Sequence, residues 1–260
     1  MQFLEIYLPY FFLFIFGTIF GSFLNVSIDR LSTGRSVVRG RSYCEHCKKT
    51  LSAIELVPLV SFLLQKGKCK HCKAKIPPRL FVVELIIGVL FPLLYLYQQQ
   101  TSLSLLPVVF LGIIIVFLIG IFFADISYGL IPDKMVIVIF FSAIFYLLSI
   151  NAPFLNHLLS GFGALLFFLT LFVVTKGKGM GFGDVKLSFV LGLLLGFPLI
   201  VLCLYLAFLT GALVSIILVI WKKLRFFGGT IPFGPFLVFG TIIALFFGNQ
   251  FLIPFLMKFL

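Results

Sequence analysis

Four of the five cysteines fall in two short pairs whose spacing is that of a metal site. The first pair brackets Glu45 and His46 and the second brackets Lys70 and His71, with 21 residues between the pairs. A CxxC pair brings two sulfurs to one ion, and four thiolates are a common ligand set of structural zinc. A redox dithiol pair is the alternative, but one CxxC would then have no role. The expected zinc ligands are Cys44, Cys47, Cys69 and Cys72, with both histidines facing solvent.

Two aspartates stand at the edges of apolar stretches, where a carboxylate is costly. Asp125 follows some 20 apolar residues, and Asp184 follows a glycine-rich approach that contains Gly181 and Gly183. An ionisable residue next to the membrane interior is a functional hypothesis by default, and glycines let the backbone approach a neighbour or a substrate. If the two carboxylates meet, one can act as general base on a water while the other, protonated, polarises a scissile carbonyl. That is the chemistry of an aspartic protease.

The same aspartates also have a structural interpretation, which the residues alone leave open. Asp184 would cap a helix N-terminus, and Asp125 would pair with Lys134 or Lys186. Nothing in the sequence shows that Asp125 and Asp184 meet. Asp133 follows a proline at the start of an apolar run, where an acid stabilises the first helical turn, so we expect a structural role for it.

The apolar residues that must position these groups are too numerous for a water-soluble globule. They make up 62% of the 260 residues, against roughly half in a soluble domain, and only 11% of the residues are charged. At ~20 residues per crossing, the sequence predicts an all-α membrane protein with about eight transmembrane helices. The expected runs are 3–28, 80–97, 103–124, 135–150, 154–175, 185–197, 199–221 and 231–253. The sixth run is short for a full crossing, so we expect it to be tilted, to lie in thinned bilayer or to be partly re-entrant. The first run is about 25 residues long, carries Glu5 in place of a basic n-region and is followed by basic residues, which argues against a cleavable signal peptide.

The net charge of +12 is distributed as in a multi-pass membrane protein. Nearly all lysines and arginines lie in alternate loops, which the positive-inside rule assigns to the cytoplasm. Those loops are 30–79, 125–134, 176–186 and 222–235, so both termini are expected outside. The basic residues then serve topology and contact with anionic lipid, and no nucleic-acid partner is expected. Residues 30–79 are too few for a core of their own, so we expect zinc to fold this cytoplasmic loop. The sequence shows no fixed-period repeat.

Taken in order, five stretches of the chain resemble the type IV prepilin peptidases, which are GxGD intramembrane aspartic proteases. Isoleucine replaces the leucine of the family's LPD motif, and Ser32 stands where proline is frequent. The matching stretches are residues 21–30 (GSFLNVSIDR), the two cysteine pairs with their linker, Asp125 with residues 131–133 (IPD), residues 181–187 (GFGDVKL) and residues 231–235 (IPFGP).

This resemblance implies a bifunctional enzyme of the bacterial inner membrane. It would cleave the leader of type IV prepilins or pseudopilins on the cytoplasmic side and methylate the new N-terminus with S-adenosylmethionine. The implied catalytic pair is Asp125 and Asp184, with Asp133, Gly181, Gly183 and Lys186 as auxiliary residues. No glycine-rich nucleotide fingerprint indicates where the methyl donor binds. The implied domains are a first span (1–29), a zinc-binding loop (30–79) and a peptidase core (80–260).

Three alternatives stay open at this point. A sister GxGD peptidase for preflagellins or signal-peptide remnants would share the aspartates but is not expected to carry four cysteines. A transporter could use the aspartates as an ion relay, although few other acids accompany them. A non-enzymatic assembly protein with a zinc scaffold is the third. For the remaining motif residues we expect Asn25 and Arg30 to anchor the first span, and Glu84 to pair with Arg79 or Lys75.

Overall fold

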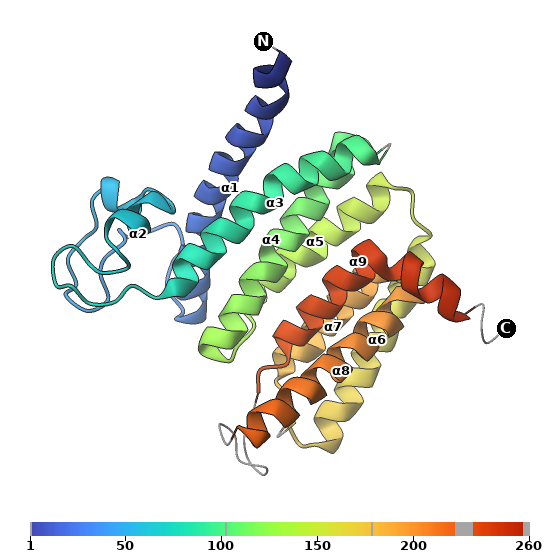
Figure 1. Ribbon diagram of the computed structural model, residues 1–260. Helices are drawn as coiled ribbons and strands as arrows, with labels where there is room; N and C mark the ends of the chain where they lie inside the picture. The colour runs from blue at the N-terminus through green and yellow to red at the C-terminus, as the bar shows by residue number, and fades with distance from the viewer. Residues whose placement is uncertain (1, 102, 178, 222–230, 257–260) are drawn as a thin grey trace. The chain divides into compact units, whose positions relative to one another are not determined.

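The computed structural model describes residues 2–101, 103–177, 179–221 and 231–256 (Figure 1). Its regular elements in these ranges are helices, which confirms the all-α prediction. The long helices are α1 (Gln2–Ser32), α3 (Pro78–Gln100), α4 (Leu105–Tyr128), α5 (Asp133–Ser149), α6 (Phe154–Val174), α7 (Phe182–Leu195), α8 (Leu199–Ile220) and α9 (Gly234–Leu256). Two short elements, η1 (Ile54–Leu56) and α2 (Val60–Leu64), lie between α1 and α3. Most of the predicted loop 222–235 lies outside the described residues.

Each of the eight predicted apolar runs corresponds to one of these long helices. Five of them, α1, α3, α4, α6 and α8, are long and apolar enough to cross a membrane, so the chain is a multi-pass membrane protein. The shortest is α7, with 14 residues. At 1.5 Å per residue it is ~21 Å long, less than the ~30 Å hydrocarbon core of a bilayer. The short sixth run of the sequence is therefore a short helix.

The chain divides into two compact units, residues 1–112 and 113–260, which are described separately. In the first unit α1 packs against α3 through glycines. A Cβ on Gly17 would lie 2.6 Å from the Ile87 carbonyl oxygen, and one on Gly21 would lie 2.7 Å from the Glu84 Cα. Small residues let helices approach closely where lipid offers no hydrophobic drive for association.

In the second unit α7 is the central helix, with α5, α6, α8 and α9 packed around it. Ten of its 14 residues are buried, and its Gly192 meets α6 so closely that a Cβ would lie 2.5 Å from the Ser160 carbonyl oxygen. A helix that ends short of the bilayer surface is tolerated where protein surrounds it. Burial among its neighbours therefore makes the shortness of α7 tolerable in a membrane.

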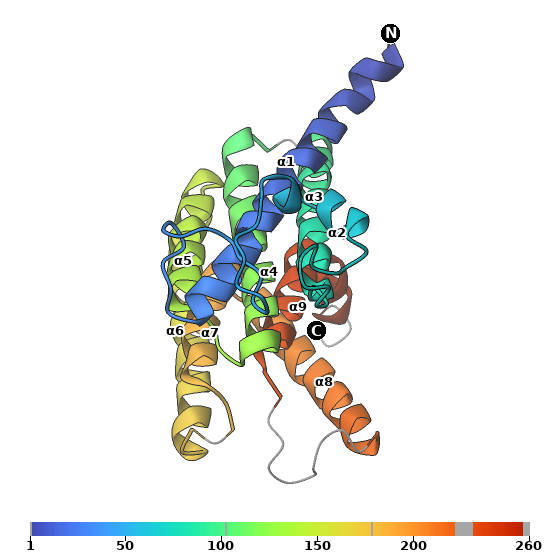
Figure 2. The same ribbon diagram turned by 90° about the vertical axis from the view of Figure 1, so that its left-hand side faces the viewer.

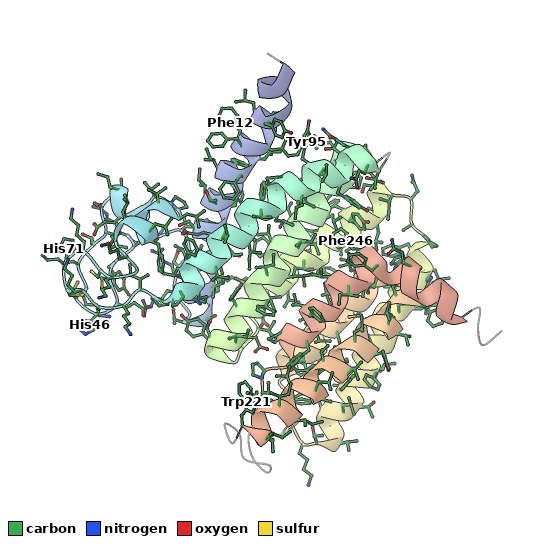
Figure 3. The ribbon with its side chains drawn as sticks, viewed as in Figure 1. Phe12, His46, His71, Tyr95, Trp221 and Phe246 are labelled. Carbon is green, nitrogen blue, oxygen red and sulfur yellow. The ribbon has the colours of Figure 1, made fainter. Side chains whose placement is uncertain are left out.

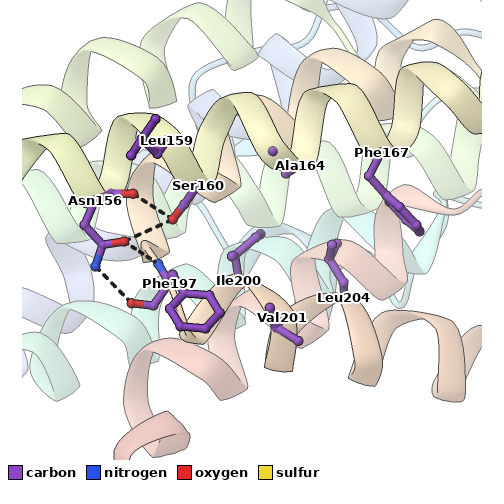
Figure 4. A pocket seen from close by; sticks show the side chains of 10 residues that line it. Asn156, Leu159, Ser160, Ala164, Phe167, Phe197, Ile200, Val201 and Leu204 are labelled. Atoms are coloured by element: carbon purple, nitrogen blue, oxygen red, sulfur yellow. Dashed lines mark hydrogen bonds between the residues drawn. The ribbon is translucent and has the colours of Figure 1, made fainter.

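The end of α7 is held to the start of α6 by side-chain hydrogen bonds (Figure 4). The Asn156 amide accepts from the Phe197 N–H at 3.1 Å and donates to the Phe197 carbonyl oxygen at 3.0 Å. Ser160 donates to the Asn156 carbonyl oxygen, and the His157 ring contacts the Leu193 carbonyl oxygen at 3.0 Å. The backbone between α7 and α8 is thus bound to α6 at the edge of an apolar groove.

Candidate active site and metal centre

Asp125 lies near the end of α4 and is 5% exposed. Its Oδ2 accepts a hydrogen bond of 2.9 Å from the N–H of Gly234, the first residue of α9. A Cβ at position 234 would lie 2.6 Å from that oxygen, so the contact requires glycine. A helix N-terminus also favours a negative charge. Asp125 is therefore held by backbone, and the alternative pairing with Lys134 or Lys186 is not what the structure shows.

Asp184 occupies the first turn of α7 and is 6% exposed. Its Oδ2 accepts a 3.1 Å hydrogen bond from the Gly181 N–H at the N-cap position, which is one half of a capping box. The structural interpretation of Asp184 as a helix cap is thus correct for its Oδ2 atom. Its Oδ1, however, is buried and has no hydrogen-bond partner among the described residues. Leaving a buried carboxylate oxygen unpaired is costly, so this atom is available for a ligand.

The two aspartates meet in one site around Ile131. A Cβ on Gly183 would lie 3.0 Å from the Ile131 Cβ, and one on Gly234 would lie 3.4 Å from the Ile131 Cδ1. Ile131 therefore contacts both the glycine beside Asp184 and the glycine that holds Asp125. The carboxylates are also close enough for the charge of one to act on the other.

Asp133 and Lys186 form an ion pair at the edge of this site. Asp133 begins α5, and its carboxylate accepts from the Lys186 ammonium on the first turns of α7. Both side chains are at least one-third exposed, in contrast to the buried aspartates. The pair ties the start of α5 to the start of α7, which agrees with the structural role expected for Asp133.

Gly234 is the residue of this site that the sequence did not reveal. From sequence, Pro232 and Pro235 are interpreted as a helix break, and residues 231–235 as an alternative lip for an extended substrate. Their glycine N–H reaches Asp125, 109 residues earlier in the chain. The only local signal was a glycine at the start of a helix, where backbone N–H groups are free to bind an anion.

The four paired cysteines converge on one point in the first unit. Their sulfur atoms lie within 4.8 Å of one another, and the Cys44 and Cys72 sulfurs are 3.9 Å apart. Four sulfurs at the Zn–S distance of a tetrahedral site would be ~3.8 Å apart. The arrangement thus fits one tetrahedrally coordinated ion.

The two cysteine pairs are built as structural copies. In the first, the Cys44 N–H donates to the Lys49 carbonyl oxygen at 2.9 Å, and in the second the Cys69 N–H donates to the Ala74 carbonyl oxygen at 2.8 Å. An antiparallel bridge closes each hairpin. Lys48 in the first hairpin and Lys73 in the second have φ values of 58° and 60°. The sequence shows no periodic repeat along the chain, yet this one local duplication exists.

Backbone groups prepare the sulfur of Cys69 for a metal. The N–H groups of Cys72 and His71 donate to it and lower the pKa of the Cys69 thiol to about 7. A lower pKa favours the thiolate, which is the metal-binding form. His46 and His71 lie at the outer rim of the loop (Figure 3), and His71 contacts Glu55 at 3.6 Å. Neither histidine belongs to the cluster of four sulfurs.

Side chains of α1 and α3 fix the ends of this loop. Arg30 donates to four carbonyl groups, those of Ser36, Val37, Arg39 and Gly40. Asn25 donates to the Leu80 carbonyl oxygen at 2.9 Å, so it ties α1 to the start of α3. Arg79 pairs with Asp29. Glu84 instead accepts the Leu59 N–H at 2.8 Å, and the expected pairing of Glu84 with Arg79 or Lys75 is wrong.

Comparison with known proteins relates both sites to one family. The family models "Bacterial Peptidase A24 N-terminal domain" and "Type IV leader peptidase family" match residues 15–98 and 112–216. The first range contains the four cysteines and the second contains Asp125, Asp133 and Asp184. No solved structure matches the chain significantly.

Three curated relatives carry the name prepilin leader peptidase/N-methyltransferase. The protein of Bacillus subtilis (strain 168) is 34% identical over 240 residues, which cover 92% of this chain and 94% of the relative. The Stutzerimonas stutzeri protein is 30% identical and the Aeromonas hydrophila protein 28%, each over 91% of this chain and 90% of the relative. Because this similarity runs through the cysteine loop and the aspartate site alike, the chain belongs to the type IV leader peptidase family, the prepilin leader peptidases/N-methyltransferases.

Proposed function

We propose that this chain is an aspartic endopeptidase that removes the leader from type IV prepilins or pseudopilins, with Asp125 and Asp184 as its catalytic pair. The supporting observation is that the two buried carboxylates share one site and that each is held through Oδ2 by a single glycine N–H. This leaves the Oδ1 of Asp184 buried and without a hydrogen-bond partner in the part of the chain that the structure describes. A helix cap alone would have no use for that atom.

The proposed reaction uses the pair in complementary protonation states. The ionised carboxylate takes a proton from water as the water oxygen attacks the scissile carbonyl carbon, while the protonated carboxyl donates to the carbonyl oxygen. Collapse of the tetrahedral intermediate breaks the C–N bond: the first carboxyl gives its proton to the leaving amine, and a hydroxyl of the intermediate returns a proton to the second carboxylate. Because the Oδ2 atoms are occupied by glycine N–H groups, the Oδ1 atoms face the reacting groups. The fixed Oδ2 contacts keep both carboxylates in place during the reaction.

We further propose that cleavage takes place at the cytoplasmic face of the bacterial inner membrane. Asp125 is near the end of α4 and Asp184 near the start of α7. Each is followed within ten residues by a lysine, Lys134 and Lys186, at helix starts that the positive-inside rule assigns to the cytoplasmic side. A leader that enters from the cytoplasm would reach this site while the apolar helix of the pilin stays in the bilayer.

The cysteine cluster and the second activity complete the proposal. We assign zinc to Cys44, Cys47, Cys69 and Cys72, where it would fold the loop of residues 30–79. The relatives' name includes an N-methyltransferase, for which S-adenosylmethionine would supply the methyl group. No residue is assigned to that donor, because the chain has no glycine-rich nucleotide fingerprint. The cluster also favours this family over a sister GxGD peptidase.

Replacement of either catalytic aspartate tests the proposal. We expect Asp125→Asn and Asp184→Asn each to reduce leader cleavage by roughly 10⁴-fold, because an amide can neither accept a proton from water nor act as the acid. Asp133→Asn should only weaken cleavage. The measurement is cleavage of a purified prepilin by the full chain in proteoliposomes.

Methylation of a previously cleaved pilin is the control, since this activity shows that a variant is folded. It should persist in both asparagine variants. Cleavage at close to the wild-type rate in either asparagine variant would return both aspartates to a structural role.

A further inference from the structure

The segment between the two cysteine pairs, residues 54–64, presents apolar side chains outward. It comprises η1 and α2, and Ile54, Leu63 and Leu64 are 75%, 62% and 74% exposed. Val60, Leu63 and Leu64 are spaced i, i+3 and i+4, which places them on one face of α2. We call the exposed set the apolar face: Ile54, Leu56, Val57, Val60, Leu63 and Leu64. An exposed apolar set of this kind marks an interaction surface.

The charges around the apolar face are arranged for contact with a negatively charged partner. The only charged residue within residues 54–64 is Glu55, and its side chain is 7% exposed. Its carboxylate accepts the Ser52 N–H and hydroxyl at 2.9 and 2.7 Å. The chain that follows carries exposed lysines at positions 66, 68, 70, 73 and 75. The result is an apolar face without an outward negative charge, followed in the chain by five exposed lysines.

Contacts with α3 fix the position of α2 along the axis of α3, which is one of the helices long and apolar enough to cross a membrane. The Leu59 N–H, at the start of α2, donates to Glu84, and the Phe62 ring lies 5.2 Å from that of Phe81. Glu84 is six residues after Pro78, which begins α3, so this contact is ~9 Å along the helix. Figure 2 shows α2 beside α3. α2 therefore lies alongside the turns at which α3 enters the bilayer.

We propose that residues 54–64 are an interfacial anchor that binds an anionic lipid surface. Its apolar face would enter the boundary between headgroups and acyl chains, where amphipathic segments bury their apolar side ~5–10 Å deep. The adjacent lysines would remain at the level of the lipid phosphates, which attract basic segments. Lipid is the partner that fits because both ends of the loop continue into membrane helices, α1 and α3, and because the Glu84 contact holds α2 at that depth.

Depth-resolved fluorescence quenching of the full-length protein tests the anchor. Trp221 is the only tryptophan, so Trp221→Phe provides a background in which Leu64→Trp becomes the single reporter. The protein is reconstituted in vesicles of phosphatidylcholine and phosphatidylglycerol whose acyl chains are brominated near the headgroup. We expect short-wavelength emission that is strongly quenched by these lipids. Quenching should decrease when phosphatidylglycerol is replaced by phosphatidylcholine.

Val38→Trp in the same background is the matched control. Val38 lies in the same loop, outside residues 54–64, and is 92% exposed, so its reporter should emit as in water and remain unquenched. One bound metal per chain shows that each variant keeps the loop folded. Water-like, unquenched emission from Leu64→Trp would overturn the proposal, and a shift of that emission only on addition of a prepilin would assign the face to substrate. Equal quenching of both reporters would also overturn it, because the contact would then be unspecific.

Discussion

The metal centre and the aspartate site solve one problem, the gathering of like-charged groups, in two different ways. The four sulfurs are gathered by two short hairpins of the same construction, each closed by hydrogen bonds within a few residues. The two carboxylates are 59 residues apart in sequence and meet because α4, α7 and α9 converge, with a glycine N–H from α9 holding one of them. Local backbone geometry defines the first site, whereas helix packing defines the second. Loss of a cysteine should therefore disturb only the loop that carries the four sulfurs. A small shift of one helix should be enough to disturb the aspartate site.

The largest effect should come from a cysteine of the cluster. We expect Cys72→Ser to reduce bound zinc from one per chain to none, because three thiolates and a hydroxyl bind the ion far more weakly. Proteolysis should then reach residues 41–76 while the helix content stays unchanged. Metal analysis and limited proteolysis measure the two effects.

Cys203→Ser serves as the control for that substitution. Cys203 is buried in α8, where its sulfur lies 3.4 Å from the Thr241 hydroxyl, and it is outside the cluster. This variant should keep its zinc. A loss of helix content on removal of zinc would contradict the local character of the metal centre.

The aspartate site should respond to a single added methyl group. Gly234→Ala places a Cβ 2.6 Å from the Asp125 Oδ2, so the carboxylate or the start of α9 must move. A displacement of that size at a catalytic group costs on the order of 10²-fold in rate, which leader-cleavage kinetics would measure. Gly163→Ala, where a Cβ meets nothing within 4 Å, should cleave at the wild-type rate. Equal rates for the two variants would mean that the Gly234 contact does not position Asp125.

The smallest effect should come from the exposed ion pair. Asp133→Asn or Lys186→Gln should lower the cleavage rate about two- to five-fold, in line with the ~0.2–1 kcal/mol of an exposed pair. Exchange of the two charges, Asp133→Lys with Lys186→Asp, should restore part of the rate. The restoration is incomplete because a lysine at the start of α5 opposes the helix dipole. If the double variant cleaves more slowly than both Asp133→Asn and Lys186→Gln, the pair does not act by holding α5 to α7.

The sequence predicted the metal centre more completely than the aspartate site, because local backbone geometry defines the first and helix packing defines the second. Two CxxC pairs carry their own geometry, so their spacing alone indicated one ion bound by Cys44, Cys47, Cys69 and Cys72. Whether Asp125 and Asp184 meet depends on packing between distant helices, which spacing does not encode. The Gly234 contact is made by a backbone N–H, which every residue except proline has, so residue type gives no direct signal for it. The partner of Glu84 was missed because the nearby cations Arg79 and Lys75 made an ion pair the simpler expectation.

The burial of α7 has a consequence for how the protein responds to different lipids. Spanning helices adjust to a thicker or thinner bilayer by tilting, at a modest cost per ångström of mismatch. α7 is enclosed by other helices and bound to α6 at its far end through Asn156 and His157. Its Asp184 end is therefore positioned by protein contacts and insulated from hydrophobic mismatch. The position of Asp184 relative to α6 should stay constant in membranes of different thickness, even where spanning helices change their tilt.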